Sequence, residues 1–560
     1  MPFQSCCETD PIPMSGNRFA KLRTDALYGI LFGVIFFYNH LSAFDSWRDE
    51  RLYFYFERLT ASHNIAPVAP FHQPLGYENL RAIFKHLNTE ALNSEQLSGY
   101  WFFTQQFNPD SLLSDARSPS NWRSLISQSN KSFLYWSHPE KGILAIHLLG
   151  NSGTISRISP DEQLAPYIRF GGSIEGYMPA LHLSFSIRGY NGIVLANKQL
   201  ALHKREFSYT YKLSETEESA YLDDTAGELV FENSQLYMSL GRNHFKVGYG
   251  ELTPLWGTNH PPCDRLFMKL LLDPLEMTAI HAKLMGEEIM IADSIRGGVR
   301  QISEKYFAYH RFAFNLGRYT QIAAGEMVIY AERGLDLSYL NPFQFYKSAE
   351  HNNRDRDNTV LFLDFFTNCW RNWRFFAVFM LDDMNFSYLG TDWWGNKTLW
   401  HLGAICYEME RWTPLSLSVE YLRISPYFFS HRLANRNFST SRYPLGNDIQ
   451  PNSDYSLGTI KWMPDARWFC KFKLGFLRHG ANFTAENDSL VNTGGDINLG
   501  HREFDSESAR FLAGDLQCYW DWGIECEWEP IRNWFVRSSV VGSQQPNSSV
   551  FFYLDWTIWF

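Results

Sequence analysis

Charged residues are scarce in this 560-residue sequence, because Asp, Glu, Lys and Arg together make up 20% of it, against about 25% in an ordinary globular protein. Basic residues are the scarcer kind: 50 Lys and Arg stand against 60 Asp and Glu, which gives a formal net charge of −10. Nucleic-acid-binding proteins carry a basic patch or stripe. We therefore expect no nucleic-acid partner.

Long hydrophobic runs are also missing after the N-terminal region, where no 18 uncharged apolar residues follow one another. A transmembrane helix takes about 20 such residues, and the mean hydropathy is only −0.30. The sequence therefore excludes a polytopic helical membrane protein. Disorder is excluded as well, because 45% of the residues are hydrophobic.

Cysteine is sparse, with eight residues and neither a CxxC pair nor a Cys/His cluster at the spacing of zinc ligands. So few cysteines over this length do not suggest a disulfide framework. We expect them to serve as free, small hydrophobic side chains, and we expect no metal site and no cofactor.

Aromatic residues, by contrast, are abundant: 19 Trp, 29 Tyr and 45 Phe amount to 17% of the chain. Surplus Trp and Tyr favour positions where one end of the ring is apolar and the other is wet. A membrane–water boundary offers such positions.

The N-terminus has the anatomy of a secretory signal peptide. A basic stretch is followed by the apolar run 26–38 and then by Leu41-Ser42-Ala43. The run is too short to span a bilayer, although a signal anchor is the alternative. We expect Met14 to be the true initiator, residues 1–43 to be removed, and the exported chain to begin near Phe44.

Residues 44–128 show helical periodicity and are predicted to form a periplasmic helical subdomain. Leu52, Phe56 and Leu59 share one helix face, and a second helix follows over Leu80 to Leu87. A third helix is expected from Ser94 to Phe107.

From residue 129 to residue 560 the period changes to two. Alternating apolar residues begin at Leu181, at Leu415 and at Trp468, and one long run extends from Leu516 to Trp528. Strict alternation is typical of a strand with one apolar and one polar face. These runs exceed the usual 5–6 residues of soluble strands and carry Trp or Tyr toward their ends, which favours an outer-membrane β-barrel over a soluble sandwich.

The end of the sequence agrees with a barrel. Apolar residues alternate from Val550 to Phe560, and a terminal Phe on such a strand resembles the sorting signal of bacterial outer-membrane proteins. The fold class predicted is mainly β: a large antiparallel transmembrane barrel of about 18 strands, an even number as expected for one chain. The polar stretches 434–455 and 485–507 are expected to be extracellular loops.

Enzyme motifs are absent: the sequence has no G-x-S-x-G elbow, P-loop, HExxH or dinucleotide fingerprint. We therefore expect no catalytic activity. A barrel hydrolase would need an acid/base or nucleophile pair at the rim, and no motif singles one out.

The most distinctive polar pieces lie in the middle of the sequence. They are Gly241-Arg242, Gly248-Tyr249-Gly250, Tyr309-His310-Arg311, Gly325-Glu326, Tyr339-Leu340-Asn341-Pro342, Glu350, Asp357-Asn358 and Leu381-Asp382-Asp383. Their order and spacing resemble the Wzi family of capsule assembly proteins, and the stretch from Glu57 to Leu75 is similar to that family's helical N-terminal part. The resemblance implies an outer-membrane barrel with a periplasmic helical bundle that attaches surface polysaccharide.

Eight residues are candidates for glycan binding: Arg242, His310, Arg311, Glu326, Asn341, Glu350, Asp382 and Asp383. Their side chains can form paired hydrogen bonds to sugar hydroxyls, and the cations would suit an acidic polysaccharide. The alternative is that lumen-facing charges pair with one another for structural reasons. On a strand, Asp382 and Asp383 point to opposite faces, so at most one of them faces the lumen.

The leading hypothesis is therefore a monomeric, non-enzymatic protein of the bacterial outer membrane that binds capsular or extracellular polysaccharide. Outer-membrane lipid surrounds it, and polysaccharide export machinery is a further expected partner. The alternative is a porin or substrate channel, for which a polar lumen is equally expected. A lumen plugged by the N-terminal helices would favour the first hypothesis.

Overall fold

The protein is described by a computed structural model. It describes residues 50–62, 71–73, 87, 89–107, 134–138, 142–159, 161–292, 297–383, 386–388, 390–408, 414–486, 488–531, 533–544 and 549–559. The predicted signal peptide, most of the predicted second helix and Phe560 lie outside these residues, as does the predicted boundary near residue 128.

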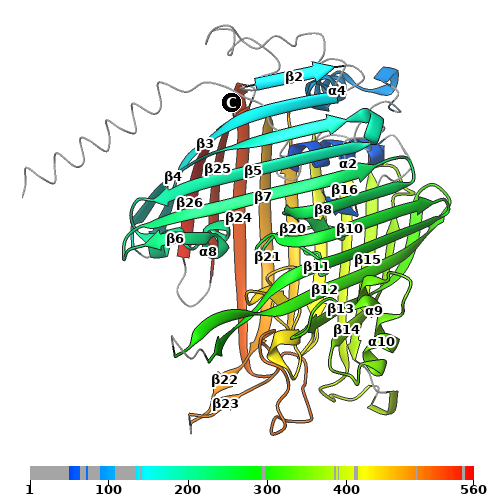
Figure 1. Ribbon diagram of the computed structural model, residues 1–560, viewed down its shortest axis with the longest axis vertical. Helices are drawn as coiled ribbons and strands as arrows, with labels where there is room; N and C mark the ends of the chain where they lie inside the picture. Colours follow the sequence, from blue (N-terminus) through cyan, green and yellow to red (C-terminus); the bar gives the residue numbers. More distant parts are fainter. Residues whose placement is uncertain are drawn as a thin grey trace, which may run out of the picture.

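The described strands form a closed antiparallel barrel (Figure 1), which confirms the predicted fold and its 18 strands. In order around the barrel they are β3 (Gly142–Ser159), β4 (Gln163–Met178), β5 (Leu183–Val194), β7 (Ala220–Glu232), β8 (Leu236–Asn243), β10 (Cys263–Leu272), β11 (Leu275–Ile291), β12 (Val299–Leu316), β13 (Thr320–Ala331), β14 (Asn358–Thr367), β15 (Trp373–Asp383), β16 (Lys397–Tyr407), β17 (Leu415–Ile424), β20 (Ser453–Trp462), β21 (Trp468–Ala481), β24 (Asp515–Ile531), β25 (Trp534–Ser543) and β26 (Ser549–Trp559).

The barrel closes where β26 pairs with β3, so that the ring of 18 strands has no first or last edge. Two short strands add to the ring: β2 (Leu134–His138) pairs with β3, and β6 (Tyr211–Glu215) pairs with β7. One predicted strand began too early. Leu181 belongs to the short helix η2 (Pro179–Leu181), because Pro179 starts a turn there, and β5 begins at Leu183.

The alternation of β24 shows how the wall is oriented. Leu516, Trp520, Ile524 and Trp528 are all more than a third exposed, although they are large and apolar. On the other face of the strand, Asp521 accepts a hydrogen bond from the Tyr455 hydroxyl. An apolar exterior around a polar interior is the pattern of a transmembrane barrel, and the predicted outer-membrane location is confirmed.

The two ends of the barrel differ. One end has short turns, such as the two residues between β10 and β11 and the three between β12 and β13. The other end carries the long connections 244–262, 332–357, 425–452 and 482–514. Outer-membrane barrels have short periplasmic turns and long extracellular loops. The predicted loop 485–507 falls at this long-loop end, and so does 434–452 of the other predicted loop, whose last three residues begin strand β20.

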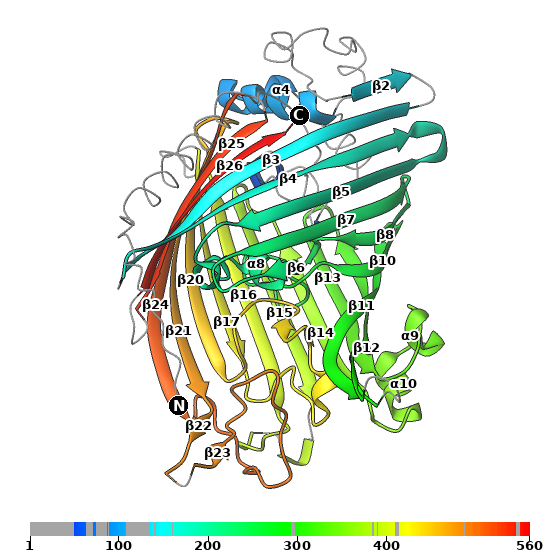
Figure 2. The same cartoon turned by 60° about the vertical axis from the view of Figure 1, so that its left-hand side comes forward.

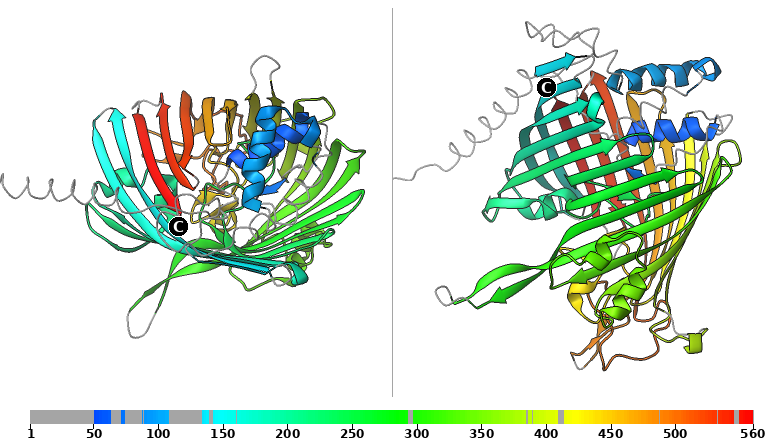
Figure 3. Two further views of the ribbon diagram at one scale, coloured as in Figure 1. Left: turned by 90° about the horizontal axis from the view of Figure 1, so that it is seen from above. Right: turned by 45° about the vertical axis from the view of Figure 1, so that its right-hand side comes forward.

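Helix α2 (Glu50–Ser62) lies inside the mouth of the barrel at the short-turn end (Figure 3), where its apolar side chains pack on Tyr407, Met463 and Phe469 of the barrel. Helix α4 (Ser94–Phe107) lies beside it and has the predicted bounds. The two helices are joined by an ion pair of 2.9 Å between Arg58 and Glu95.

Two of the long loops fold into the lumen. We call residues 244–262 the first inward loop and residues 425–452 the second inward loop. Tyr249 and Trp256 of the first, and Phe428 and Phe438 of the second, are buried in one large core with the inner wall. Within the first inward loop, β9 (Lys246–Val247) pairs with β1 (His72–Gln73) from the N-terminal segment. The lumen is therefore filled from both ends.

Candidate carbohydrate-binding surface

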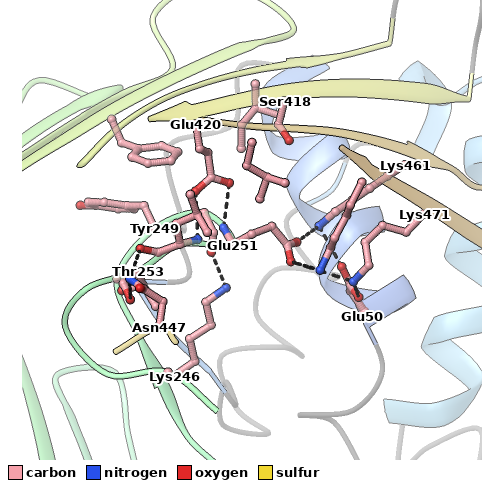
Figure 4. Close-up of a pocket in the computed structure, with 18 of the residues that line it drawn as sticks. Glu50, Lys246, Tyr249, Glu251, Thr253, Ser418, Glu420, Asn447, Lys461 and Lys471 are labelled. Atoms are coloured by element: carbon pink, nitrogen blue, oxygen red, sulfur yellow. Dashed lines mark hydrogen bonds and ion pairs between the residues drawn. The ribbon is translucent and has the colours of Figure 1, made fainter. Parts of the chain in front are cut away.

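A charged chamber of about 640 Å³ remains inside the barrel between α2, the first inward loop and the wall (Figure 4). Three lysines project into it from adjacent strands, Lys461 of β20 and Lys471 and Lys473 of β21. Three carboxylates contact them: Glu50 of α2, Glu251 of the first inward loop and Glu525 of the neighbouring wall strand β24. Each filling element thus places an acid against the basic patch of the wall.

The ion pairs of the charged chamber are short. Glu251 lies 2.8 Å from Lys461 and 3.1 Å from Lys473, and Glu50 lies 2.9 Å from Lys461 and 2.7 Å from Lys471. Burial raises the pKa of Glu50, but the ammonium groups of Lys461 and Lys471 outweigh it and lower that pKa from 4.5 to about 2. The same balance holds the pKa of Glu251 well below 4.5. Both acids are therefore ionised at neutral pH.

The first inward loop is also held from its other side. The two carboxylate oxygens of Glu420 accept the backbone N–H groups of Glu251 and Leu252, at 2.8 and 3.0 Å. His401 contacts the same carboxylate through Nε2 at 3.0 Å. These bonds fix the backbone of the first inward loop inside the lumen.

The structure does not bring the eight predicted residues into one site. Arg311 is in the lumen, where its guanidinium pairs with Asp364 at 2.7 Å and lies over the ring of Phe71. Both members of the pair are completely buried. This arrangement supports the structural alternative for Arg311, because a buried charge requires a partner.

His310 and Glu326 are brought together, but on the outer wall. They are register partners on β12 and β13, and His310 Nε2 lies 3.2 Å from Glu326 Oε2. His310 and Arg311 are neighbours on β12 and therefore face opposite sides of the wall, because successive strand residues alternate. His310 is thus separated from Arg311, which lies in the lumen.

Asp382 and Asp383 differ in burial, but the register of β15 shifts between Leu381 and Asp383, so strict alternation does not describe this pair. That at most one of them faces the lumen stays a prediction. Asp382 is buried and accepts the backbone N–H of Phe429 at 2.9 Å, whereas the Asp383 side chain is 52% exposed. Lys397 contacts both carboxylates, at 3.1 and 3.2 Å. Asp382 thereby ties the second inward loop to the wall.

The remaining three candidates lie apart. Arg242 is exposed and pairs with its cross-strand neighbour Asp264 at 2.7 Å. Asn341 ends the short helix α9 (Leu337–Leu340), and its side chain accepts the Phe343 N–H. Glu350, on α10 (Tyr346–Asn352), pairs with Lys347. Whether any of the eight binds a glycan stays a prediction.

A different group of residues has the character of a sugar-binding surface. It comes from the β15–β16 connection, the second inward loop and the β21–β24 connection, all at the long-loop end. We call it the aromatic loop surface; it comprises Tyr388, Trp393, Trp394, His501 and Glu507, and the buried Tyr427 packs against His501.

One carboxylate oxygen organises this surface. Glu507 Oε2 accepts the indole N–H groups of Trp393 and Trp394, at 3.2 and 2.9 Å. Trp394 stacks on His501 with the ring centres 4.0 Å apart, and Trp393 stacks on Tyr388 at 4.9 Å. The backbone supports the geometry, since the Trp394 N–H donates to the Glu507 carbonyl at 3.1 Å. The result is a row of partly exposed rings with a fixed carboxylate.

Gly395 allows the close packing of Trp393, because a Cβ at this position would lie only 2.3 Å from the Trp393 ring. Next to the surface, Arg502 pairs with Asp505 at 2.7 Å and lies over the ring of Phe504. Burial raises the pKa of Asp505, but hydrogen bonds from Arg502 outweigh it and hold that pKa below 3.8. The Arg502 guanidinium is therefore already paired with an ionised carboxylate.

The sequence held one signal of this surface that the prediction missed: two adjacent Trp residues within Thr391-Asp392-Trp393-Trp394-Gly395. Trp between turn-forming residues cannot be explained by a strand face. The partner of both Trp residues is Glu507, which lies in another connection. Neither stretch of sequence alone shows that the two connections meet.

Other chemistry finds no support within the described ranges. No group of three or more His, Cys, Asp or Glu residues that could hold a metal ion occurs there, and the six described cysteines are free. None of the helices in these ranges is long and apolar enough to pass through a bilayer.

Comparison with known proteins supports the fold. No protein-family model matches the chain, and no curated protein is similar to it in sequence. Among solved structures, the barrel is similar to Wzi of Escherichia coli, an outer-membrane protein involved in group 1 capsule assembly and a carbohydrate-binding β-barrel. The TM-score is 0.53 at 11% identity, and the match covers 91% of this chain and 98% of Wzi.

Two outer-membrane proteins of Pseudomonas aeruginosa are also similar. OccK8 (OprE) has a TM-score of 0.43 at 9% identity, over 74% of this chain and 98% of its own. OprD has a TM-score of 0.40 at 11% identity, over 74% of this chain and 95% of its own. At 11% identity the likeness to Wzi shows a shared barrel fold alone, so membership of the Wzi family stays a prediction.

Proposed function

We propose that this outer-membrane barrel binds surface polysaccharide through its aromatic loop surface and thereby helps to assemble or hold a capsule-like layer. The observation that carries the proposal is the shared carboxylate of Glu507, which holds Trp393 and Trp394 side by side at the long-loop end. Indole faces cover the apolar face of a pyranose, and carboxylates accept hydrogen bonds from its hydroxyls. The carbohydrate-binding barrel Wzi, similar in fold, agrees with this function.

The filled lumen supports attachment rather than passage. Helix α2 closes the short-turn end, and both inward loops occupy the interior, where the first is fixed by Glu420. A protein that retains a polymer on the cell surface needs no open pore. We propose accordingly that the protein acts as a binding protein without catalytic activity.

The alternative function is an outer-membrane channel, and one observation favours it. The charged chamber of about 640 Å³ is polar and large enough for a small solute. A channel would require the first inward loop to leave its ion pairs with Lys461 and Lys473. Conductance of the intact protein in a planar bilayer, close to that of an open porin, would establish the channel.

The proposal is tested with Trp394→Ala and with Trp370→Ala as matched control. Trp370 is 60% exposed but lies in the turn between β14 and β15, at the opposite end of the barrel. We expect Trp394→Ala to weaken binding of purified surface polysaccharide about 2- to 10-fold, the value of one aromatic contact, and Trp370→Ala to leave it unchanged. Equal binding by both variants, or unchanged cell-associated polysaccharide after deletion of the whole gene, contradicts the proposal.

A further inference from the structure

One long connection folds outward. The outer helical loop, residues 332–357 with α9 and α10, folds back over the outside of the barrel (Figure 2). Tyr339 and Tyr346 of this loop pack on Tyr306 and Tyr330, which lie on the outer face of β12 and β13. Tyr330 and Tyr339 stack with their ring centres 5.1 Å apart. The loop therefore covers part of a wall that otherwise faces lipid.

Under this cover lies the pair of His310 and Glu326. Both side chains are almost fully buried, Tyr346 donates its backbone N–H to Glu326 Oε2 at 2.6 Å, and the Tyr346 ring stacks on His310 at 4.3 Å. Ionisable side chains on a lipid-facing wall are costly unless they are shielded and paired. Helix α10 supplies both the shield and a hydrogen bond.

The cover leaves an outer groove of about 380 Å³. Its floor is a row of cross-strand neighbours in which the small Ala324 stands between Phe312 and Leu363. Phe343 and Phe345 of the outer helical loop form the other side. The short side chain of Ala324 between two large ones is what opens the groove.

The rim of the outer groove is apolar and uncovered. Phe343 and Phe345 are about 70% exposed, and Leu337 is exposed as well. Exposed apolar side chains clustered beside a groove mark an interaction site, and on an outer-membrane barrel the surrounding medium is lipid. Contact with lipid therefore explains why these apolar side chains are exposed in the protein.

A second, independent observation concerns His310. It lines the outer groove, and its Nδ1 is buried and has no hydrogen-bond partner in the described part of the chain. Buried polar atoms in native proteins nearly always have a partner. Nε2 faces the carboxylate of Glu326, so Nδ1 is the ring nitrogen left for a hydrogen bond to a further group.

We propose that the outer groove binds one acyl chain of a membrane lipid, and that a hydroxyl group on this chain forms a hydrogen bond with Nδ1 of His310. The apolar floor of Phe312, Ala324 and Leu363 fits the hydrocarbon, and Phe343 and Phe345 enclose it from the loop side. Because lipid tails are as apolar as the wall, close packing and the single hydrogen bond select this chain over the bulk lipid. The site is separate from the aromatic loop surface and does not depend on any glycan.

The test is native mass spectrometry of the full-length protein, purified from vesicles of phosphatidylethanolamine with hydroxylated or with plain acyl chains of equal length. We expect one lipid to remain bound per barrel. A hydroxylated chain should be retained about fivefold better than a plain chain, since one hydrogen bond contributes about that factor. Filling the groove by Ala324→Phe should reduce retention at least fivefold.

The matched control is Ala377→Phe. Ala377 lies on the outer face of β15, two residues from the groove residue Phe379, but does not line the groove. Its variant should retain the lipid as the unchanged protein does, and all three proteins should show the heat-dependent gel shift of a folded barrel. No retained lipid, or equal retention by Ala324→Phe, overturns the acyl-chain site. Equal retention of both lipids overturns the role of His310.

Discussion

Glu251 of the first inward loop lies 2.8 Å from Lys461 of β20, and this ion pair joins the loop to the wall of the barrel. Glu251 also reaches Lys473 at 3.1 Å, while its own backbone N–H is held by Glu420. The side chain of Glu251 therefore fixes the first inward loop to two basic strands, while Glu420 holds the backbone of the loop from the other side.

Glu251→Gln should weaken the attachment of the first inward loop to the barrel wall. The substitution keeps the shape of the side chain but removes the charge, and a hydrogen bond to a charged group contributes about 1.5–3 kcal/mol. We expect open events of the barrel in a planar bilayer to become about tenfold more frequent or more. Glu217→Gln is the control, because Glu217 is an exposed loop residue outside the charged chamber. Equal conductance of the two variants would show that the ion pairs do not hold the loop.

Acidification should act on the same contacts. The pKa of Glu50 is lowered from 4.5 in the unfolded chain to about 2 in the fold, so its contribution to stability is complete above pH 4.5 and is lost as the pH falls through 2. Glu251 shifts in the same direction. We expect conductance to stay low from neutral pH down to about 4.5 and to rise between 4.5 and 2. In the double variant Glu50→Gln, Glu251→Gln this rise should disappear, and a rise confined to alkaline pH would refute the mechanism.

The sequence predicted the wall of this protein well because its pattern is local. The alternation from Leu516 to Trp528 reappears as β24, with its apolar face outward, and the helical period from Ser94 to Phe107 reappears as α4. Both patterns follow from which side chains meet lipid or core, and each is contained in one continuous stretch.

The candidate site could not be predicted in the same way. Tyr309-His310-Arg311 is one polar piece in the sequence, yet its members face opposite sides of β12, and the cover of His310 comes from α10. Trp394 and Glu507 lie in different connections and meet only because these loops fold against each other. Closure of the barrel and the path of each loop are long-range properties that periodicity does not contain.

Arg311 should prove structural rather than ligand-binding. Arg311→Met leaves Asp364 as an unpaired buried carboxylate, which costs about 3–5 kcal/mol. We expect the temperature of the heat-dependent gel shift to fall clearly in this variant and to recover in Arg311→Met, Asp364→Leu. Polysaccharide binding by the double variant should equal that of the unchanged protein. Loss of binding with recovered stability would instead return Arg311 to the glycan site.

Glu507 should be the residue on which polysaccharide binding depends most. Glu507→Ala removes the acceptor that Trp393 and Trp394 share, so both indoles lose their fixed orientation as well as a charged hydrogen bond. Because the site is exposed to water, each lost bond is worth only about 1 kcal/mol, which predicts polysaccharide binding about tenfold weaker or more. Glu503→Ala, an exposed acid of the same loop, is the control, since it removes the same charge without touching the indoles. If both variants bind equally weakly, the net charge of the loop and not the aromatic geometry determines recognition, and a change in tryptophan fluorescence confined to Glu507→Ala tells the two causes apart.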